Sequence, residues 1–109
     1  MLEALFGNST VEKILFYLST YGEGYPLGMA RNFGVPVNKI QQQLRRLENG
    51  GIVVSRLFGK VRLYNLNPRY PFLDELRGLL SKAFQFVPEA EKENYYRNRT
   101  RPRRAGKPL

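Results

Sequence analysis

Hydrophobic residues near the start of the chain recur at helical spacing. Between Ser9 and Tyr21 they fall on one side of a helix: Val11, Ile14, Leu15 and Leu18. The order Ser9-Thr10-Val11-Glu12 predicts a capping box, in which the Ser9 side chain accepts a hydrogen bond from the Glu12 amide and Glu12 reaches back. Residues 1–6 form a short apolar lead-in that could pack on the core or on a second subunit.

Two further helices are predicted, with a short turn between them. Pro26 suits the first position of a helix that runs to Phe33, and the turn is Gly34-Val35-Pro36. In the next helix, residues 37–49, the apolar side follows the i, i+4, i+7 rule: Ile40, Leu44 and Leu47. The pair Gly50-Gly51 is a typical signal for the end of a helix.

The polar side of the helix over 37–49 carries amides and one guanidinium. At about 100° per residue, a group of polar residues projects between roughly 100° and 200° from Ile40: Asn38, Gln41, Gln42, Arg45 and Asn49. Amides and guanidinium groups pair bidentately with base edges in a DNA major groove. Most polar faces are simply solvated, but such faces usually mix Glu with Lys, and this one does not. The face is therefore a candidate for reading DNA.

A small β-hairpin is predicted after this helix. Residues 52–57 are rich in β-branched side chains, Phe58-Gly59-Lys60 turns the chain, and residues 61–66 return. Basic residues lie near the tip: Arg56, Lys60 and Arg62. We expect these side chains to hold the DNA backbone or the minor groove.

A last apolar helix is predicted to open at Pro71 and to reach Phe84. Its apolar stripe is broader than one face of a small three-helix core can cover, which favours an interface between two copies of the chain. The expected homodimer contacts are Leu5, Phe72, Leu76, Leu79, Leu80 and Phe84. The alternative interpretation places all of this surface inside the core of one chain.

The character of the chain changes after Pro88. We expect residues 1–88 to form the domain and residues 89–109 to form a basic tail, flexible over its last dozen residues. Between Asn94 and Arg104 the tail interleaves tyrosine with arginine, a pattern that suits single-stranded nucleic acid. The competing interpretation of these tyrosines is a docked C-terminal helix or plain disorder.

The charge of the chain favours a polyanionic partner. Its 109 residues hold 18 Lys and Arg against 9 Asp and Glu, a net charge of +9. Residues 1–88 alone hold 11 basic and 6 acidic side chains, so the domain is basic without its tail. Nucleic acid is the first candidate for such a surface. No apolar run approaches the roughly 18 residues that span a bilayer, and residues 1–6 do not resemble a signal peptide, so we expect a cytoplasmic protein without membrane contact.

Cysteine and histidine are both absent from the sequence. This composition excludes disulfides, thiol nucleophiles, histidine bases and nearly every transition-metal site. No phosphate-binding or dinucleotide-binding motif is present either. We therefore expect no enzyme activity, no cofactor and no metal.

The order helix, helix, turn, helix, hairpin, helix looks like the winged helix-turn-helix fold, an α+β architecture. The sequence resembles the ArsR-like regulators of bacteria and archaea over the following segments: Leu5-Phe6-Gly7-Asn8-Ser9-Thr10, Ile14-Leu15, Met29-Ala30, Gly34-Val35, residues 40–53 and Tyr64-Asn65-Leu66-Asn67-Pro68. More narrowly, it is similar to the small ArsR-like proteins associated with minimal nucleotidyltransferases, in its Phe6-Gly7-x-x-Thr10 opening and its Asn67-Pro68-x-x-Pro71 segment.

The sequence departs from the ArsR-like pattern in two respects. Metal-sensing members use Cys and His ligands, which this chain lacks, so metal-responsive regulation is not implied. The Ser or Thr cap usual at the start of the third helix is replaced by Pro36-Val37-Asn38, so the resemblance does not imply hydroxyl contacts to phosphate at that end.

The resemblance and the polar face together imply a transcriptional regulator that binds double-stranded DNA as a homodimer in a prokaryotic nucleoid. The helix over 37–49 would enter the major groove, with Asn38, Gln41, Gln42 and Arg45 at the bases and Lys39 and Arg46 on phosphates. Two alternatives stay open. One is a module for protein–protein contact, for example with a nucleotidyltransferase, and the other is binding of RNA or single strands through the basic tail.

Overall fold

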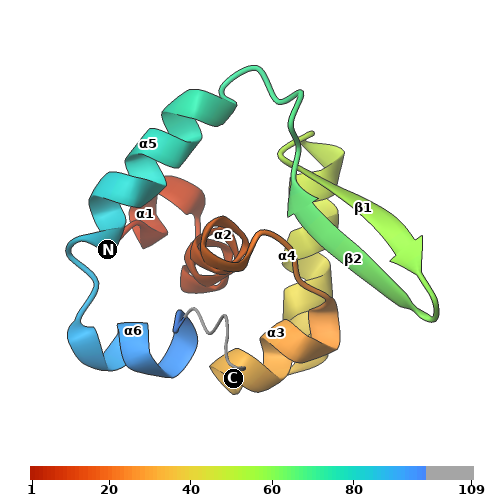
Figure 1. Cartoon of the computed structure of the whole chain (residues 1–109), viewed down its shortest axis with the longest axis horizontal. Helices are drawn as coiled ribbons and strands as arrows, with labels where there is room; N and C mark the ends of the chain where they lie inside the picture. The colour runs from red at the N-terminus through yellow and green to blue at the C-terminus, as the bar shows by residue number, and fades with distance from the viewer. Residues whose placement is uncertain (98–109) are drawn as a thin grey trace, which may run out of the picture.

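The computed structural model describes residues 1–97, which form six helices and one two-stranded antiparallel sheet (Figure 1). In chain order the elements are α1 (Glu3–Phe6), α2 (Ser9–Tyr21), α3 (Pro26–Phe33), α4 (Val37–Asn49), β1 (Val53–Phe58), β2 (Val61–Leu66), α5 (Leu73–Phe84) and α6 (Glu89–Tyr95). The predicted helices over 9–21, 26–33 and 37–49 are confirmed at these bounds. The α+β class with a hairpin wing is confirmed as well.

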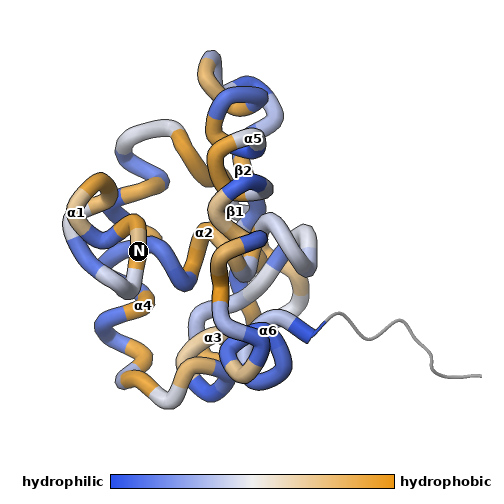
Figure 2. Tube along the Cα trace, turned by 90° about the vertical axis from the view of Figure 1, so that its left-hand side faces the viewer, coloured by the Kyte–Doolittle hydropathy of each residue, from blue (hydrophilic) through white to orange (hydrophobic). Residues whose placement is uncertain are grey.

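Helix α2 lies at the centre of the fold, and the other helices surround it (Figure 1). Its predicted core residues Val11, Ile14, Leu15 and Leu18 are almost completely buried, as the helical spacing predicts. Phe16, which the spacing did not place in the core, is buried as well. The amphipathic pattern continues in α4, along which hydrophobic and hydrophilic residues alternate (Figure 2). Since the buried residues of α2, α3, α4 and α5 belong to one cluster, the described part of the chain has a single core.

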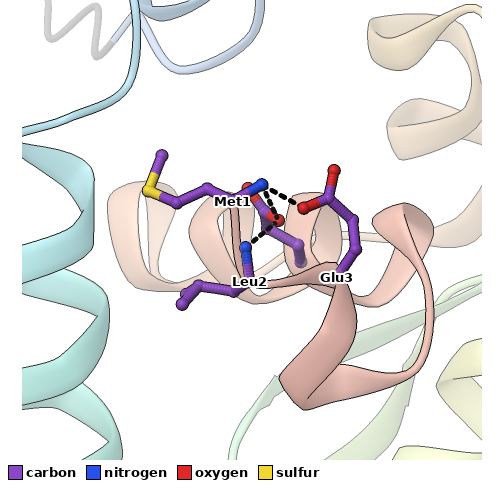
Figure 3. A network of polar contacts seen from close by, with 4 residues as sticks. Met1, Leu2 and Glu3 are labelled. Carbon is purple, nitrogen blue, oxygen red and sulfur yellow. Dashed lines mark hydrogen bonds and ion pairs between the residues drawn. The ribbon is translucent and has the colours of Figure 1, made fainter.

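The N-terminus of α2 is capped differently from the predicted capping box. Asn8, in an extended conformation, is the cap, and its Oδ1 accepts a hydrogen bond from the Val11 amide at 2.8 Å. Ser9 is already the first helical residue, so its hydroxyl is one position too late to cap. Glu12 accepts instead from the amide of Leu2 at 2.8 Å and lies 3.5 Å from the amino group of Met1, which also pairs with Glu3 (Figure 3).

The hairpin is antiparallel, and its register runs from the pair Val53 and Leu66 to the pair Phe58 and Val61. The turn is therefore the two residues Gly59-Lys60, one residue shorter than predicted. Gly59 has φ +64° and Lys60 has no positive φ, which is the pattern of a type II′ turn. This turn matches the twist of the strands and fixes the register of the wing.

Helix α5 begins at Leu73 rather than at Pro71, and it buries more of its stripe than expected. Leu80, predicted to contact a second copy, is only 1% exposed and lies in the core of its own chain. Phe84 packs its ring edge-on against Phe16 with a centroid separation of 5.7 Å. The broad stripe thus serves the core and leaves a smaller set of residues for contact with a partner.

The expected boundary at residue 88 is corrected by the packing of residues 89–97. Tyr96 is buried and lies edge-on to Phe16 at 5.6 Å and to Phe84 at 5.5 Å between ring centroids. Asn32 Nδ2 donates to the Tyr95 carbonyl at 2.9 Å, so α3 holds the end of α6. The docked-helix interpretation of these tyrosines therefore applies, and the rest of the predicted tail, residues 98–109, lies outside the described residues.

Replacing Tyr96 tests whether residues 89–97 belong to the fold. We expect Tyr96→Ala to lower the free energy of unfolding by about 3–5 kcal/mol, because it removes a buried ring from the core. Tyr96→Phe should cost little near neutral pH, because among residues 1–97 no hydrogen bond is found for the Tyr96 hydroxyl. Urea unfolding followed by circular dichroism measures both variants, and an unchanged midpoint for Tyr96→Ala would contradict the docking.

The wild-type protein and Tyr96→Phe should also differ in how their stability changes at alkaline pH. Burial raises the pKa of the Tyr96 phenol above its ordinary value of 10.0. The unfolded chain therefore loses this proton first, so the wild-type protein loses stability as pH rises above about 10. Tyr96→Phe should show a shallower loss over this range.

Candidate nucleic-acid interface

The helix-turn-helix places the polar face of α4 outwards. Gly34 has φ +69°, a left-handed conformation that ends α3, and its amide donates to the Ala30 carbonyl at 2.9 Å. After this turn, α4 presses its apolar side into the core: Ile40, Leu44 and Leu47. The opposite side is exposed throughout, as predicted: Asn38, Gln41, Gln42, Arg45 and Asn49.

The polar side chains of this face are free of competing contacts. Among residues 1–97, no hydrogen bond or ion pair engages the side chains of Asn38, Lys39, Gln41, Gln42 or Arg45. Because α4 is held by buried residues on its other side, these groups are presented on a rigid support. They can exchange bound water for a ligand without breaking any contact in the fold.

Arg46 points to a different part of the molecule. Its guanidinium donates to the Phe6 carbonyl at 3.3 Å and to Gln43 Oε1 at 3.1 Å. The end of a short helix such as α1 leaves carbonyls without partners, which is why a cation is attracted there. The structure therefore does not group Arg46 with the outward face, although sequence spacing placed it at the flank of that face.

The basic residues of the wing, Arg56, Lys60 and Arg62, are all exposed. Arg62 donates to Ser55 Oγ at 3.1 Å, and Ser55 donates to Glu48 Oε2 at 2.7 Å, so a polar chain links the wing to α4. Arg56 pairs with Glu23 at 3.2 Å in an exposed ion pair. Lys60 has no ion pair or side-chain hydrogen bond within the described residues.

The Tyr64 phenol lies near charged side chains of both α4 and the wing. Burial raises the pKa of the Tyr64 phenol, and the Glu48 carboxylate raises it further, while Arg62 and Arg45 oppose both effects. Side chains of α4 and β2 therefore share one electrostatic neighbourhood. Residues 37–66 hold six Lys and Arg and one acid, Glu48. Because Arg46 points to α1 and Glu23 pairs with Arg56, this surface carries five basic groups and two acids.

The loop between α2 and α3 supports the wing in a way that sequence reasoning missed. Gly24 forms an isolated antiparallel bridge with Tyr64, and each residue's amide donates to the other's carbonyl, at 3.0 and 2.8 Å. A Cβ atom on Gly24 would lie 2.7 Å from the Tyr17 ring, so only glycine fits here. The wing is thus fixed to the helical core on a second side.

A groove of about 360 Å³ joins the three elements of this surface. It is lined by Gln41 and Val37 of α4, by the start of α3, and by Lys60, Val61 and Arg62 of the wing. The start of α3 contributes Tyr25 and Leu27, both exposed, which the sequence did not single out as site residues. In the sequence, Tyr25 and Leu27 are marked only as large apolar residues that flank Pro26. Large apolar residues are equally typical of core positions, so this pattern does not identify a site.

No group of three or more Cys, His, Asp or Glu side chains within residues 1–97 is arranged to hold a metal ion. In the same part of the chain, no helix has the length and apolar character needed to cross a membrane.

Neither the protein-family models nor the curated proteins compared with this chain give a match. Among solved structures, the chain is similar to a mutant form of ZitR from Lactococcus lactis in the apo state. The two share 19% sequence identity and superpose with a TM-score of 0.57, covering 78% of this chain and 67% of the ZitR chain. At this level of identity the likeness shows the fold, and it confirms a winged helix-turn-helix.

Proposed function

We propose that this protein is a transcriptional regulator that binds double-stranded DNA with sequence preference. Helix α4 enters the major groove and the β1–β2 wing lies along the backbone or minor groove. The observation that carries the proposal is the outward face of α4, on which amides and a guanidinium are exposed and unpaired within the described residues. These groups make the bidentate contacts that distinguish adenine and guanine in a major groove.

The charge around α4 supports the same function. Without Arg46, which points to α1, the α4 and wing surface carries five basic side chains and two acids, Glu48 and Glu23. Residues 73–95 hold five acids and three basic groups. A polyanion is therefore drawn to the α4 and wing side rather than to α5 and α6. Arg56 is available to a phosphate despite its partner, because an exposed ion pair with Glu23 contributes little stability.

Substitutions on α4 separate base reading from backbone binding. We expect Gln42→Ala or Arg45→Ala to cost about 1–3 kcal/mol on the preferred duplex and to relax the preference at one position. Lys60→Ala should weaken binding to all duplexes about equally. The measurement is selection from random duplex DNA, followed by titration of the selected site, with Gln85→Ala as the control for loss of an exposed glutamine. Unchanged affinity and preference in both α4 variants would contradict the docking.

We further propose that two copies of the chain pair through the groove beside α1 and α5. The groove encloses about 420 Å³ and is lined mainly by apolar side chains. Leu5 and Phe72 lie on its lining and are 66% and 62% exposed, an unusual state for such large apolar residues. Leu76 also lines it. Leu79 and Phe84, further along α5, are half-buried and do not line the groove, and buried Leu80 is no longer part of the proposed interface.

Introducing charged side chains at the rim of this groove tests whether the protein forms the proposed homodimer. Phe72→Glu combined with Leu5→Glu should give a monomer in sedimentation, while the wild-type mass should be near twice 12.7 kDa at micromolar concentration. Phe86→Glu is the matched control, because Phe86 is equally exposed but does not line the groove. A dimer would present two α4 helices roughly 34 Å apart and select an inverted repeat with half-sites about 10 base pairs apart. A monomeric wild type that selects one half-site would contradict this proposal.

The basic segment after Arg97 is proposed to add affinity without sequence preference. It holds five basic residues: Arg99, Arg101, Arg103, Arg104 and Lys107. Truncation after Arg97, which keeps the buried Tyr96, should weaken duplex binding. It should also flatten the slope of log K against log salt, by about 0.9 for each phosphate that the segment neutralises. The selected sequence should stay the same, and a changed consensus would contradict this role.

The same experiments distinguish the alternative functions. Weak duplex binding that ignores salt would favour a protein partner, such as a nucleotidyltransferase, on the basic face. Preference for single strands that disappears on truncation after Arg97 would favour binding of RNA or single-stranded DNA through the tail.

A further inference from the structure

The tip of the wing is apolar as well as basic. Leu57 and Phe58 are 65% and 66% exposed, and Val61 beside them is also exposed. The base of the hairpin is different, because Val53 and Leu66 are buried in the core. The hairpin projects away from the helices (Figure 1), so its tip lacks the packing that the base receives. Exposed apolar side chains on a projecting hairpin are unfavourable in water, and they usually mark a contact surface.

The register fixes the direction of each side chain at the tip. Phe58 pairs with Val61 across the two-residue turn, so these two share one face of the hairpin. Leu57 pairs with Arg62 on the other face, the face on which Ser55 reaches Glu48 of α4. Apolar groups therefore stand on both faces of the tip, and Lys60 at the turn and Arg62 flank them.

We propose that Phe58 is a wedge that inserts between two base pairs from the minor groove when α4 occupies the adjacent major groove. This inference rests on the proposed DNA-binding function and adds a second element of sequence recognition to it. The partner is duplex DNA because Lys60 and Arg62 flank the apolar tip, and because the tip and the unpaired face of α4 border the same groove through Val61 and Gln41.

The dimensions of the hairpin and of DNA favour insertion of one side chain rather than of the whole wing. Strands in a sheet lie about 4.8 Å apart before side chains are added, so a two-stranded ribbon fits an undistorted minor groove of about 6 Å only if the duplex is deformed. A single apolar ring at its tip can enter, and proteins that insert such rings partly unstack a base step and kink the duplex. Lys60 and Arg62 would meanwhile meet the phosphates on either side.

Insertion has a consequence for sequence preference. Pyrimidine–purine steps such as TA and CA/TG unstack and kink most readily, so they cost the least to open. The wedge should therefore select such a step beside the bases read by α4. This preference comes from deformability, without a hydrogen bond from Phe58 to any base.

The test compares the wild-type protein with Phe58→Ala, using Phe86→Ala as the matched control. Phe86 is 67% exposed and lies after α5, outside the α4 and wing surface. Each protein selects sites from random duplex DNA, and each then binds the selected duplex with 2-aminopurine placed in turn at the flanking adenines. Thermal unfolding confirms that each variant is folded, and Phe58→Leu serves as a second variant that keeps an apolar wedge.

We expect wild-type binding to raise 2-aminopurine emission at one flanking step, which should be a TA or CA/TG step in the selected sites. Phe58→Ala should lose this emission and this flanking preference, keep the preference read by α4, and bind at least about fivefold more weakly. Phe86→Ala should match the wild type, and Phe58→Leu should retain part of the emission.

Three outcomes would overturn the wedge. If Phe58→Ala matches Phe86→Ala in emission and affinity, the wing does not insert, although DNA binding through α4 stands. If Phe58→Ala abolishes self-association in sedimentation without changing duplex binding, the tip contacts a second copy instead. If the wild-type protein binds no duplex, both the proposed function and the wedge fail.

Discussion

The packing of α4 against α2 is the interaction on which the proposed interface depends. Ile40, Leu44 and Leu47 are nearly or completely buried along one side of α4, and they set the rotation of the helix about its own axis. A shift of one residue in this packing would turn the helix by about 100° and carry the polar face away from the wing. Since a well-packed core resists such a shift, the core determines where Gln42 and Arg45 point.

The wing is held by the same core, and its contacts with the core decrease from the base of the hairpin to its tip. Val53 and Leu66 anchor its base, the Gly24 bridge to Tyr64 supports one edge, and the contact of Ser55 with Glu48 joins it to α4. Beyond these contacts the residues are exposed. The hairpin is therefore rigid where it must keep its distance from α4 and solvated where a ligand would approach it. This gradient explains why an apolar tip is compatible with a stable fold.

The sequence predicted most of this arrangement because its strongest signals are local and periodic. The spacing of Ile40, Leu44 and Leu47 established α4 and its outward face, and a proline established the start of α3. The failures share a physical cause. Asn8 and Ser9 are both good caps one residue apart, and only the backbone conformation decides between them. The burial of Leu80 and Tyr96 and the direction of Arg46 depend on contacts between segments far apart in the chain, which no local pattern contains.

Arg46 connects the two surfaces that the proposed function requires. It belongs to α4, yet its guanidinium holds the Phe6 carbonyl at the end of α1 and lines the apolar groove together with Leu47. One helix therefore turns its outward side to solvent, where DNA is proposed to bind, its inner side to the core and its edge to the groove beside α1 and α5. Anything that fills this groove touches the helix that carries the residues proposed to read bases. Pairing of two copies and recognition of DNA are for this reason expected to be thermodynamically linked through α4 rather than independent properties of two separate sites.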